Sequence, residues 1–349
     1  MRLAAAVLVL CLALGAGSAA SQTAAPVTVK VMTRNVYLGA DLTPLFSARN
    51  LNEVLATAAA VWAQQQANNF PARARALAAE IAAHRPDVVG LQEASLYRSD
   101  TPFDGPITPA EKVEQDYLKI LLAALKARGQ EYRVVATFDG TDAELPVGNP
   151  PTMDIRFTDR VSMLVRADAA KRGIRLRNAV TGQYGASLPV PVAGTTLPVR
   201  RGWVAATFMV NRRPLVVVST HLEAFNPQVR AAQGQQLLAG VAPTQVPIVL
   251  LGDFNSGPGG DRTVYDAFRG GGFSDAWEAV HGSDPGLTCC HKDDLRDADA
   301  TLRTRIDLAV YSNGVTATAA EVVGEAPGDR VAGLWPSDHA GMVATLRVP

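Results

Sequence analysis

Short apolar runs rich in β-branched residues recur along the whole chain, and this pattern constrains the fold more than any other feature. The runs are four to eight residues long and are separated by Gly, Pro or polar residues. Runs of this length and composition are typical of β-strands, because helices need longer segments with a 3.6-residue period. The predicted strands are 27–32, 87–91, 161–165, 203–210, 215–219, 248–251, 306–311 and 342–346.

Helical periodicity fills most of the intervals between these strands. The predicted helices are 51–69, 73–83, 111–127, 228–238 and 263–268, with Pro71 and Gly129 as terminators. A hairpin-length turn at 211–214 joins two of the strands, which indicates mixed rather than purely parallel sheets. The segments 99–109, 139–159 and 182–198 are rich in Pro, Gly and Asp and are predicted to be long surface loops.

The chain shows no internal repeat and no low-complexity linker, so we expect residues 27–349 to form one domain. Residues 1–20 combine one positive charge, a short apolar stretch and a small-residue end, a pattern typical of a cleaved signal peptide. The mature protein is therefore expected to be secreted or periplasmic. Cys289 and Cys290 are the cysteines that remain, and the sequence leaves open whether they form a disulfide or a free buried pair.

The charge balance argues against a general attraction for polyanions. The chain has 33 basic and 33 acidic residues, so no net field draws in nucleic acid. Two local doublets, 200–201 and 212–213, are basic, and such residues are ordinarily solvated at turns. This balance weakens a nucleic-acid substrate without excluding it.

Polar side chains follow the predicted strands at the points where the strands end. Asn35 follows the first strand, Glu93 the second, and His221 a later one, while Asp253 and Asn255 close the strand after that. Alternate residues of an extended segment point to the same side, so the last two side chains share one face. Such positions allow side chains from several strands to converge on one sheet edge.

Asp307 lies inside a predicted strand whose other residues are apolar. A buried carboxylate needs a partner, and His339, just before the final strand, is the natural one. Each of these residues is weak evidence alone. Their order along the chain is more informative.

That order resembles the endonuclease/exonuclease/phosphatase superfamily over roughly residues 27 to 347, and residues 33–42 resemble exported bacterial members. The elements that match are Asn35, Gln92-Glu93, His221, Gly252-Asp253-Phe254-Asn255, Ile306-Asp307 and Ser337-Asp338-His339. The resemblance implies an α/β fold, a four-layer sandwich of two mixed β-sheets packed face to face and flanked by helices. It implies a site at one edge of the sheets.

The resemblance also implies a metal site. Glu93 would be the principal carboxylate on a Mg²⁺ or Mn²⁺ ion, with Asn35 and Asp338 nearby, directly or through water. Hard oxygen ligands suit such ions.

Catalytic roles follow from the same matches. Asp307 would hold His339, which would act as a general base or as a cation that stabilises charge on the phosphoryl group. Asp253 would orient or deprotonate the attacking water, and Asn255 and His221 would contact non-bridging phosphate oxygens. Arg160 is a further candidate for phosphate contact, against the alternative of an ordinary surface ion pair.

The function expected is hydrolysis of a phosphate ester, most simply by a phosphodiesterase of the nuclease or sphingomyelinase type. The substrate classes left open are nucleic acid, a phospholipid headgroup and a small phosphoester. Alternatives are a phosphomonoesterase of the same fold and a catalytically inactive binding scaffold. We expect a monomer without an obligate protein partner.

Overall fold

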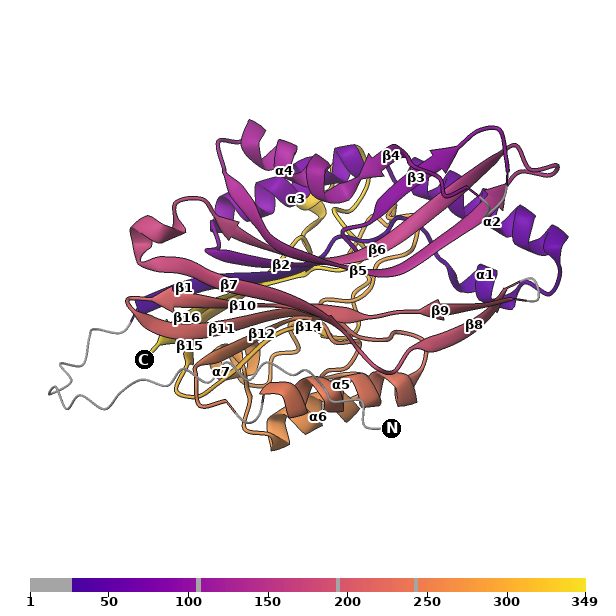
Figure 1. Cartoon of the computed structure of the whole chain (residues 1–349). Coiled ribbons are helices and arrows are strands. Elements are labelled where there is room, and N and C mark those ends of the chain that lie inside the picture. Colours follow the sequence, from indigo (N-terminus) through magenta and orange to yellow (C-terminus); the bar gives the residue numbers. More distant parts are fainter. Residues whose placement is uncertain (1–26, 105–107, 193–194, 242–243) are drawn as a thin grey trace, which may run out of the picture.

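Two β-sheets pack face to face at the centre of the structure, a computed structural model that describes residues 27–104, 108–192, 195–241 and 244–349 (Figure 1). The predicted signal peptide, residues 1–20, lies outside the described residues. None of the helices within the described ranges is long and apolar enough to cross a membrane.

The first sheet contains the two ends of the described chain side by side. Its strand order is β15-β16-β1-β2-β6-β3-β4, and β5 pairs with β6. β1 pairs in parallel with β2 and antiparallel with β16. The strands are β1 (Val27–Asn35), β2 (Val88–Gln92), β3 (Leu96–Asp100), β4 (Lys112–Asp116), β5 (Tyr132–Val147), β6 (Met153–Arg166), β15 (Thr316–Val323) and β16 (Gly341–Val348).

The second sheet has the order β13-β14-β12-β11-β10-β7, and β11 and β12 are its parallel pair. A separate two-stranded sheet is formed by β8 and β9. The strands are β7 (Ile174–Gln183), β8 (Leu188–Val192), β9 (Thr195–Val199), β10 (Gly202–Val210), β11 (Arg213–His221), β12 (Ile248–Asp253), β13 (Ser274–Asp275) and β14 (Asp307–Ser312).

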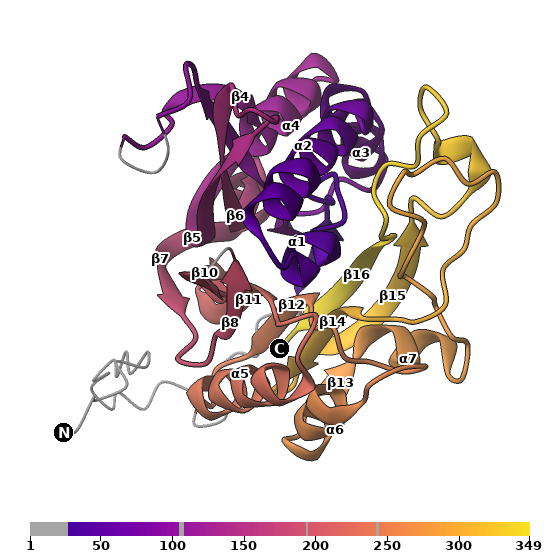
Figure 2. The ribbon, with the colours of Figure 1, turned by 90° about the vertical axis from the view of Figure 1, so that its right-hand side faces the viewer.

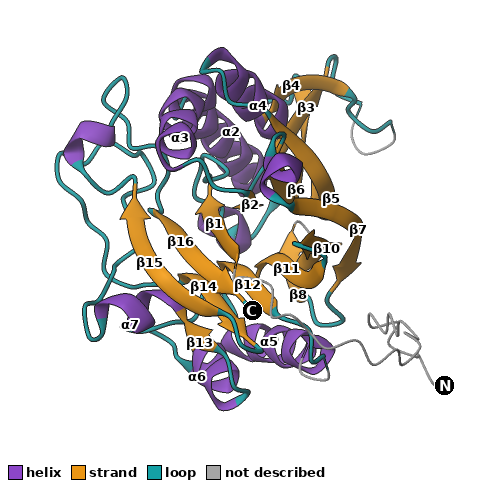
Figure 3. Cartoon of the chain, turned by 90° about the vertical axis from the view of Figure 1, so that its left-hand side faces the viewer, coloured by secondary structure: helices purple, strands orange, loops and turns teal. Residues whose placement is uncertain are grey.

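Helices cover the outer faces of both sheets. α3 and α4 lie against the first sheet and α5 and α6 against the second, which gives four layers (Figures 1 and 3). The helices are α1 (Thr43–Ser47), α2 (Leu51–Ala67), α3 (Phe70–His84), α4 (Tyr117–Ala127), α5 (Pro227–Val241), α6 (Thr263–Gly270) and α7 (Ala276–His281). The predicted four-layer α/β sandwich is confirmed.

The central strands are apolar on both faces because each face packs against a different layer. In β12, Val249 and Leu251 point into the core between the two sheets, whereas Ile248 and Leu250 point toward α5 and α6. Alternation along the strand divides these side chains between two cores. This arrangement explains the continuous apolar runs of the sequence.

One predicted helix is wrong in its first part. Residues 112–116 of the expected helix 111–127 form strand β4, and α4 begins only at Tyr117. Asp116 sets this boundary, because its side chain accepts a hydrogen bond from the backbone N–H of Lys119 (3.3 Å) and caps the helix. Pro71 likewise lies in the first turn of α3 rather than terminating a helix.

Two predicted loops contain strands. Most of 139–159 belongs to the long hairpin of β5 and β6, and 182–198 contains β8 and most of β9. A register shift between Asp139 and Asp142 interrupts the alternation of β5. The predicted hairpin between β10 and β11 is confirmed, with Asn211 and Arg212 at positive φ in its turn.

One buried arginine joins segments that are far apart in the sequence. The guanidinium of Arg73 donates hydrogen bonds to the carbonyls of Val36 (2.7 Å), Tyr37 (3.0 Å) and Pro336 (2.9 Å). The first two follow β1, and the third precedes β16. Arg73 therefore fastens together the two loops that lead away from and into the centre of the first sheet.

Candidate active site

The carboxyl ends of four strands meet at one edge of the sandwich. β1 and β2 run parallel in one sheet, β11 and β12 run parallel in the other, and β1 contacts β12. Asn35, His221 and Asp253 are the last residues of their strands, and Glu93 directly follows β2. α1, which follows β1, lies at this end of the molecule (Figure 2). The predicted convergence of strand-end side chains is therefore observed.

Asn35 links the acidic residues of the two sheets. Its Nδ2 donates to Oε1 of Glu93 (3.2 Å) and to Oδ2 of Asp253 (3.1 Å). Its Oδ1 accepts a hydrogen bond from the backbone N–H of Tyr37 (2.9 Å), which fixes the orientation of the amide. Asn35 thus presents a donor to both carboxylates.

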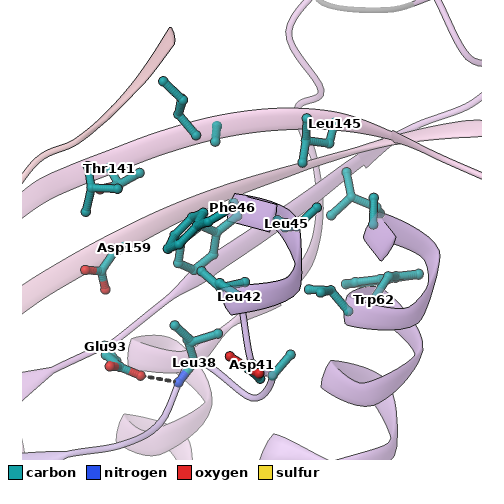
Figure 4. Close-up of a pocket in the computed structure, with 18 of the residues that line it drawn as sticks. Leu38, Asp41, Leu42, Leu45, Phe46, Trp62, Glu93, Thr141, Leu145 and Asp159 are labelled. Carbon is teal, nitrogen blue, oxygen red and sulfur yellow. Dashed lines mark hydrogen bonds between the residues drawn. The ribbon is translucent and has the colours of Figure 1, made fainter. Parts of the chain in front are cut away.

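Glu93 lies in a crowded anionic environment. Its Oε2 accepts a hydrogen bond from the backbone N–H of Leu38 (2.6 Å; Figure 4). Burial, together with the negative charges of Asp338 and Asp159, raises the pKa of Glu93 to about 8. Several acidic groups at one point repel each other, and a bound cation would remove that repulsion.

Glu93 and Asp338 fit a divalent cation by the chemistry of their donors. Both offer carboxylate oxygens at the same cavity wall, and such oxygens are the ligands that Mg²⁺ and Mn²⁺ prefer. Asp338 is half-buried, and its Oδ1 accepts a hydrogen bond from Oγ of Ser337 (3.2 Å). Asn35 contacts the carboxylates of Glu93 and Asp253 through its nitrogen, so in this arrangement it bridges those two groups rather than offering an oxygen ligand.

His339 and Asp307 form the predicted pair. Nδ1 of His339 lies 2.8 Å from Oδ2 of Asp307, and both side chains are buried. Because an ionised carboxylate can only accept, Nδ1 carries a proton and donates it. Burial alone would lower the pKa of His339, but the negative charges of Asp307, Asp338 and Asp253 outweigh burial and hold it well above its usual value.

Asp253 lies between the two histidines. Its Oδ2 is 3.8 Å from Nε2 of His339 and 3.5 Å from Nε2 of His221, while its Oδ1 accepts from the backbone N–H of Asn255 (2.9 Å). Burial raises the pKa of Asp253 to about 6, with a further increase from Asp307 and an opposing effect of His339. Asp253, Asp307 and His339 bring three possible metal-ligand atoms within 4.8 Å of one another.

His221 is held by an arginine. Nη1 of Arg201 lies 3.0 Å from Nδ1 of His221, and because a guanidinium can only donate, Nδ1 must accept. Burial, Arg201 and His339 together hold the pKa of His221 well below its usual value, so the ring is neutral. A neutral ring that accepts at Nδ1 carries its proton on Nε2, and the nearby acceptor is Oδ2 of Asp253 at 3.5 Å.

The predicted phosphate contact of Arg160 is not found within this cluster. Its guanidinium donates to the carbonyls of Ala94 (2.6 Å) and Ser95 (3.1 Å) and pairs with Asp116 (2.5 Å). Neighbouring residues of a strand point to opposite faces, so when Asp159 faces the cluster, Arg160 faces away. The structure gives Arg160 the contacts of a buried structural ion pair.

Sequence reasoning missed the pair of Asp159 and Arg201. Oδ2 of Asp159 accepts from Nη1 of Arg201 (2.7 Å), and both side chains line the cavity beside Glu93. The sequence placed Asp159 at the end of a loop and Arg201 in a basic turn doublet. Asp159 faces the site because it lies on β6, in the long β5–β6 hairpin. The sequence predicted this segment as a loop, so the position of Asp159 was missed.

Cys289 and Cys290 are joined in a disulfide, one of the two alternatives that the sequence leaves open. Sγ of Cys290 lies 3.9 Å from Nε2 of His339, at the border of the candidate site. The neighbouring His291 stacks on Trp335, with the ring centroids 4.0 Å apart.

Two stacked mixed sheets, with carboxylates and a His–Asp pair at one edge, define the DNase I-like class of phosphoester hydrolases. The sequence pattern of the endonuclease/exonuclease/phosphatase family matches residues 35–339, and the chain belongs to this family. A comparison with curated proteins finds no match.

Solved structures of the same fold cover nearly the whole chain. An endonuclease/exonuclease/phosphatase from Bacteroides vulgatus is 17% identical and covers 92% of this chain and 99% of its own, with a TM-score of 0.57. A mannosyl-6-phosphatase from Bacteroides thetaiotaomicron is 16% identical (91% and 99%, TM-score 0.54). TDP2 from D. rerio, complexed with a single-strand DNA product, is 18% identical (91% and 98%, TM-score 0.53). At these identities the likeness shows the fold.

Replacing Asp307 by alanine is expected to lower kcat by about 10²-fold while KM changes little. The carboxylate touches the imidazole of His339 rather than the cavity, so its loss frees the ring to rotate without removing a substrate contact. Steady-state kinetics on a chromogenic phosphodiester measures both constants, with the exposed Asp266→Ala as the control. Wild-type turnover in Asp307→Ala would refute the pairing as a functional element.

Proposed function

We propose that this chain is a phosphodiesterase that requires Mg²⁺ or Mn²⁺. The observation that carries the proposal is the placement of Glu93 and Asp338 beside the His339–Asp307 pair, at one end of a cavity. Carboxylates that suit a hard cation and an imidazole that can exchange a proton are the two components that phosphoester hydrolysis needs.

Glu93 and Asp338 would hold the metal ion. When bound, a divalent ion supplies Lewis-acid polarisation of a phosphoryl oxygen and stabilises charge on the leaving oxygen. Leu38 fixes the Glu93 carboxylate through its backbone N–H, and Ser337 fixes that of Asp338. Both carboxylates are therefore oriented before a ligand arrives.

His339 acts through Nε2, because Asp307 occupies Nδ1. From this atom it either takes a proton from water or, when protonated, stabilises negative charge on the phosphoryl group. Asp253, 3.8 Å from the same nitrogen, is placed to orient the attacking water. The two groups together define where the nucleophile would lie.

His221 and Asn255 are placed to contact non-bridging phosphate oxygens. The proton on Nε2 of His221 is directed toward the cluster because Arg201 occupies Nδ1. The side chain of Asn255 is held by the carbonyl of Leu222 (3.0 Å), which keeps its amide beside that imidazole. Neutral donors held in place in this way stabilise developing negative charge without reorganisation.

A parallel hydrolysis assay tests the proposal. Plasmid DNA, sphingomyelin vesicles, bis(4-nitrophenyl) phosphate and 4-nitrophenyl phosphate are each incubated with the protein and Mg²⁺, Mn²⁺ or EDTA. We expect turnover of at least one diester that requires the metal and stops in EDTA. Turnover of the monoester alone would make the protein a phosphatase. No hydrolysis of any of the four substrates with either metal would favour a catalytically inactive binding scaffold.

A further inference from the structure

An apolar cavity of about 240 Å³ opens from the carboxylates of the candidate site (Figure 4). At one end it is lined by Glu93, Asp159 and Asp338, and it extends away from them between α1, α2 and the β5–β6 hairpin. The apolar walls include Phe46 of α1, Trp62 of α2, and Ala143, Leu145, Ile155 and Phe157 of the β5–β6 hairpin.

The β8–β9 hairpin and the loop after β11 complete the wall. Leu197 and Val199 of β9 line the cavity, and the partly exposed ring of Phe225 packs edge-on against Phe46, with the ring centroids 5.0 Å apart. These segments are distant in the sequence from both α1 and β5. The cavity is therefore a product of the tertiary fold, not of one loop.

The tyrosine hydroxyls that border the apolar part of the cavity already have partners. The hydroxyl of Tyr97 donates to the carbonyl of Leu38 (2.9 Å), and that of Tyr37 donates to the carbonyl of Asp293 (3.0 Å). Arg201 is bound by Asp159 and His221. A sugar or a nucleobase in the apolar part of the cavity would lose its hydrogen bonds to water without replacement, at a considerable cost in free energy.

The charges lining the cavity also disfavour a polyanion. One basic side chain, that of Arg201, stands against five acidic ones: Asp41, Glu93, Asp159, Asp293 and Asp338. A nucleic-acid backbone is usually bound by an excess of Lys and Arg. A single phosphate group could approach through the metal ion, but a chain of phosphates would meet repulsion.

We propose that the cavity binds the alkyl chain of an amphiphilic phosphodiester, with the phosphoryl group at Glu93 and Asp338. This inference rests on the proposed phosphodiesterase function and names the substrate class of that site. An apolar cavity of about 150 Å³ accommodates benzene, so the volume here is sufficient for a short alkyl chain. The chain is buried from water while the charged phosphate stays at the polar end.

A homologous series of 4-nitrophenyl alkyl phosphodiesters tests the proposal, from ethyl through butyl and hexyl to octyl, each below its micelle-forming concentration. We expect kcat/KM to rise by about fourfold for each added methylene group, the equivalent of about 0.8 kcal/mol, until the cavity is full. A flat profile across the series would overturn the proposal.

Two substitutions of cavity residues test whether the dependence of kcat/KM on chain length arises in this cavity. Ala143→Phe fills the cavity and should lower the hexyl-to-ethyl ratio of kcat/KM by roughly tenfold. Leu145→Ala enlarges the cavity and should move the plateau of kcat/KM to longer alkyl chains. This variant keeps the test decisive if Ala143→Phe does not fold. Val134→Phe, at an exposed position of the same strand, is the matched control and should keep the wild-type ratio. Equal ratios in all three variants would exclude this cavity as the chain-binding site.

A binding measurement separates failure of this inference from failure of the proposed function. Calorimetric titration with 1-butanol, 1-hexanol and 1-octanol in EDTA requires neither metal nor turnover. Affinity that increases with chain length and is reduced in Ala143→Phe supports the cavity even if no ester is hydrolysed. Hydrolysis of the ethyl ester without any dependence on chain length would retain the phosphodiesterase and reject the alkyl site.

Discussion

Replacing His339 by alanine is expected to reduce kcat for phosphoester hydrolysis by about 10²- to 10⁴-fold. The imidazole is held by Asp307 at 2.8 Å, and its Nε2 faces the oxygen of Asp253 at 3.8 Å. Alanine removes the group that exchanges a proton or supplies positive charge at the phosphoryl centre. Single-turnover kinetics with a chromogenic phosphodiester and saturating Mn²⁺ measures the loss.

His84→Ala is the matched control for this experiment. His84 ends α3 and pairs with Glu321 (3.4 Å) on the outside of the first sheet, so its loss should leave kcat unchanged. A His339→Ala protein that retains cooperative unfolding and turns over at the wild-type rate would rule out the catalytic assignment.

Replacing Glu93 by glutamine is expected to weaken Mn²⁺ binding by at least about 10²-fold and to lower kcat/KM in parallel. The amide keeps the shape of the side chain but lacks the negative charge. Calorimetric Mn²⁺ titration measures the affinity directly and without substrate.

The same substitution is expected to raise the Tm of the metal-free protein. In that state burial, together with the negative charges of Asp338 and Asp159, raises the pKa of Glu93, so an ionised Glu93 is unfavourable in the fold. Scanning calorimetry in EDTA above pH 8 measures this effect, and Glu131→Gln, at an exposed position, is the control. Undiminished Mn²⁺ affinity in Glu93→Gln would place the metal elsewhere.

The site residues at strand ends could be predicted because two physical signals coincide there. A strand buried on both faces produces an unbroken apolar run, and the first polar residue after it marks the sheet edge. Asp253 is the first polar residue after such a run, and Asn35, Glu93 and His221 each follow one or two further polar residues at the same strand ends. Their convergence follows from the parallel pairing of β1 with β2 and of β11 with β12.

Other parts of the site depend on contacts that a linear pattern does not contain. The orientation of the Asn35 amide is set by the backbone N–H of Tyr37. The charge environment of Glu93 includes Asp159, which lies in a part of β6 that was predicted to be a loop. β8 was missed because Pro189 and Pro191 indicate a loop. They are tolerated because both strands of a two-stranded sheet are edge strands, which accept residues that lack a backbone N–H.

The position of β16 between β1 and β15 means that a late segment of the described chain completes the candidate site. Asp338 and His339 immediately precede this strand, and β1 carries Asn35, which connects the acidic residues of both sheets. A growing chain that already contains Glu93 and Asp253 still lacks His339 and strand β16, which pairs with β1. On the roles proposed for Asp338 and His339, hydrolytic capacity would therefore appear only after β16 has been synthesised.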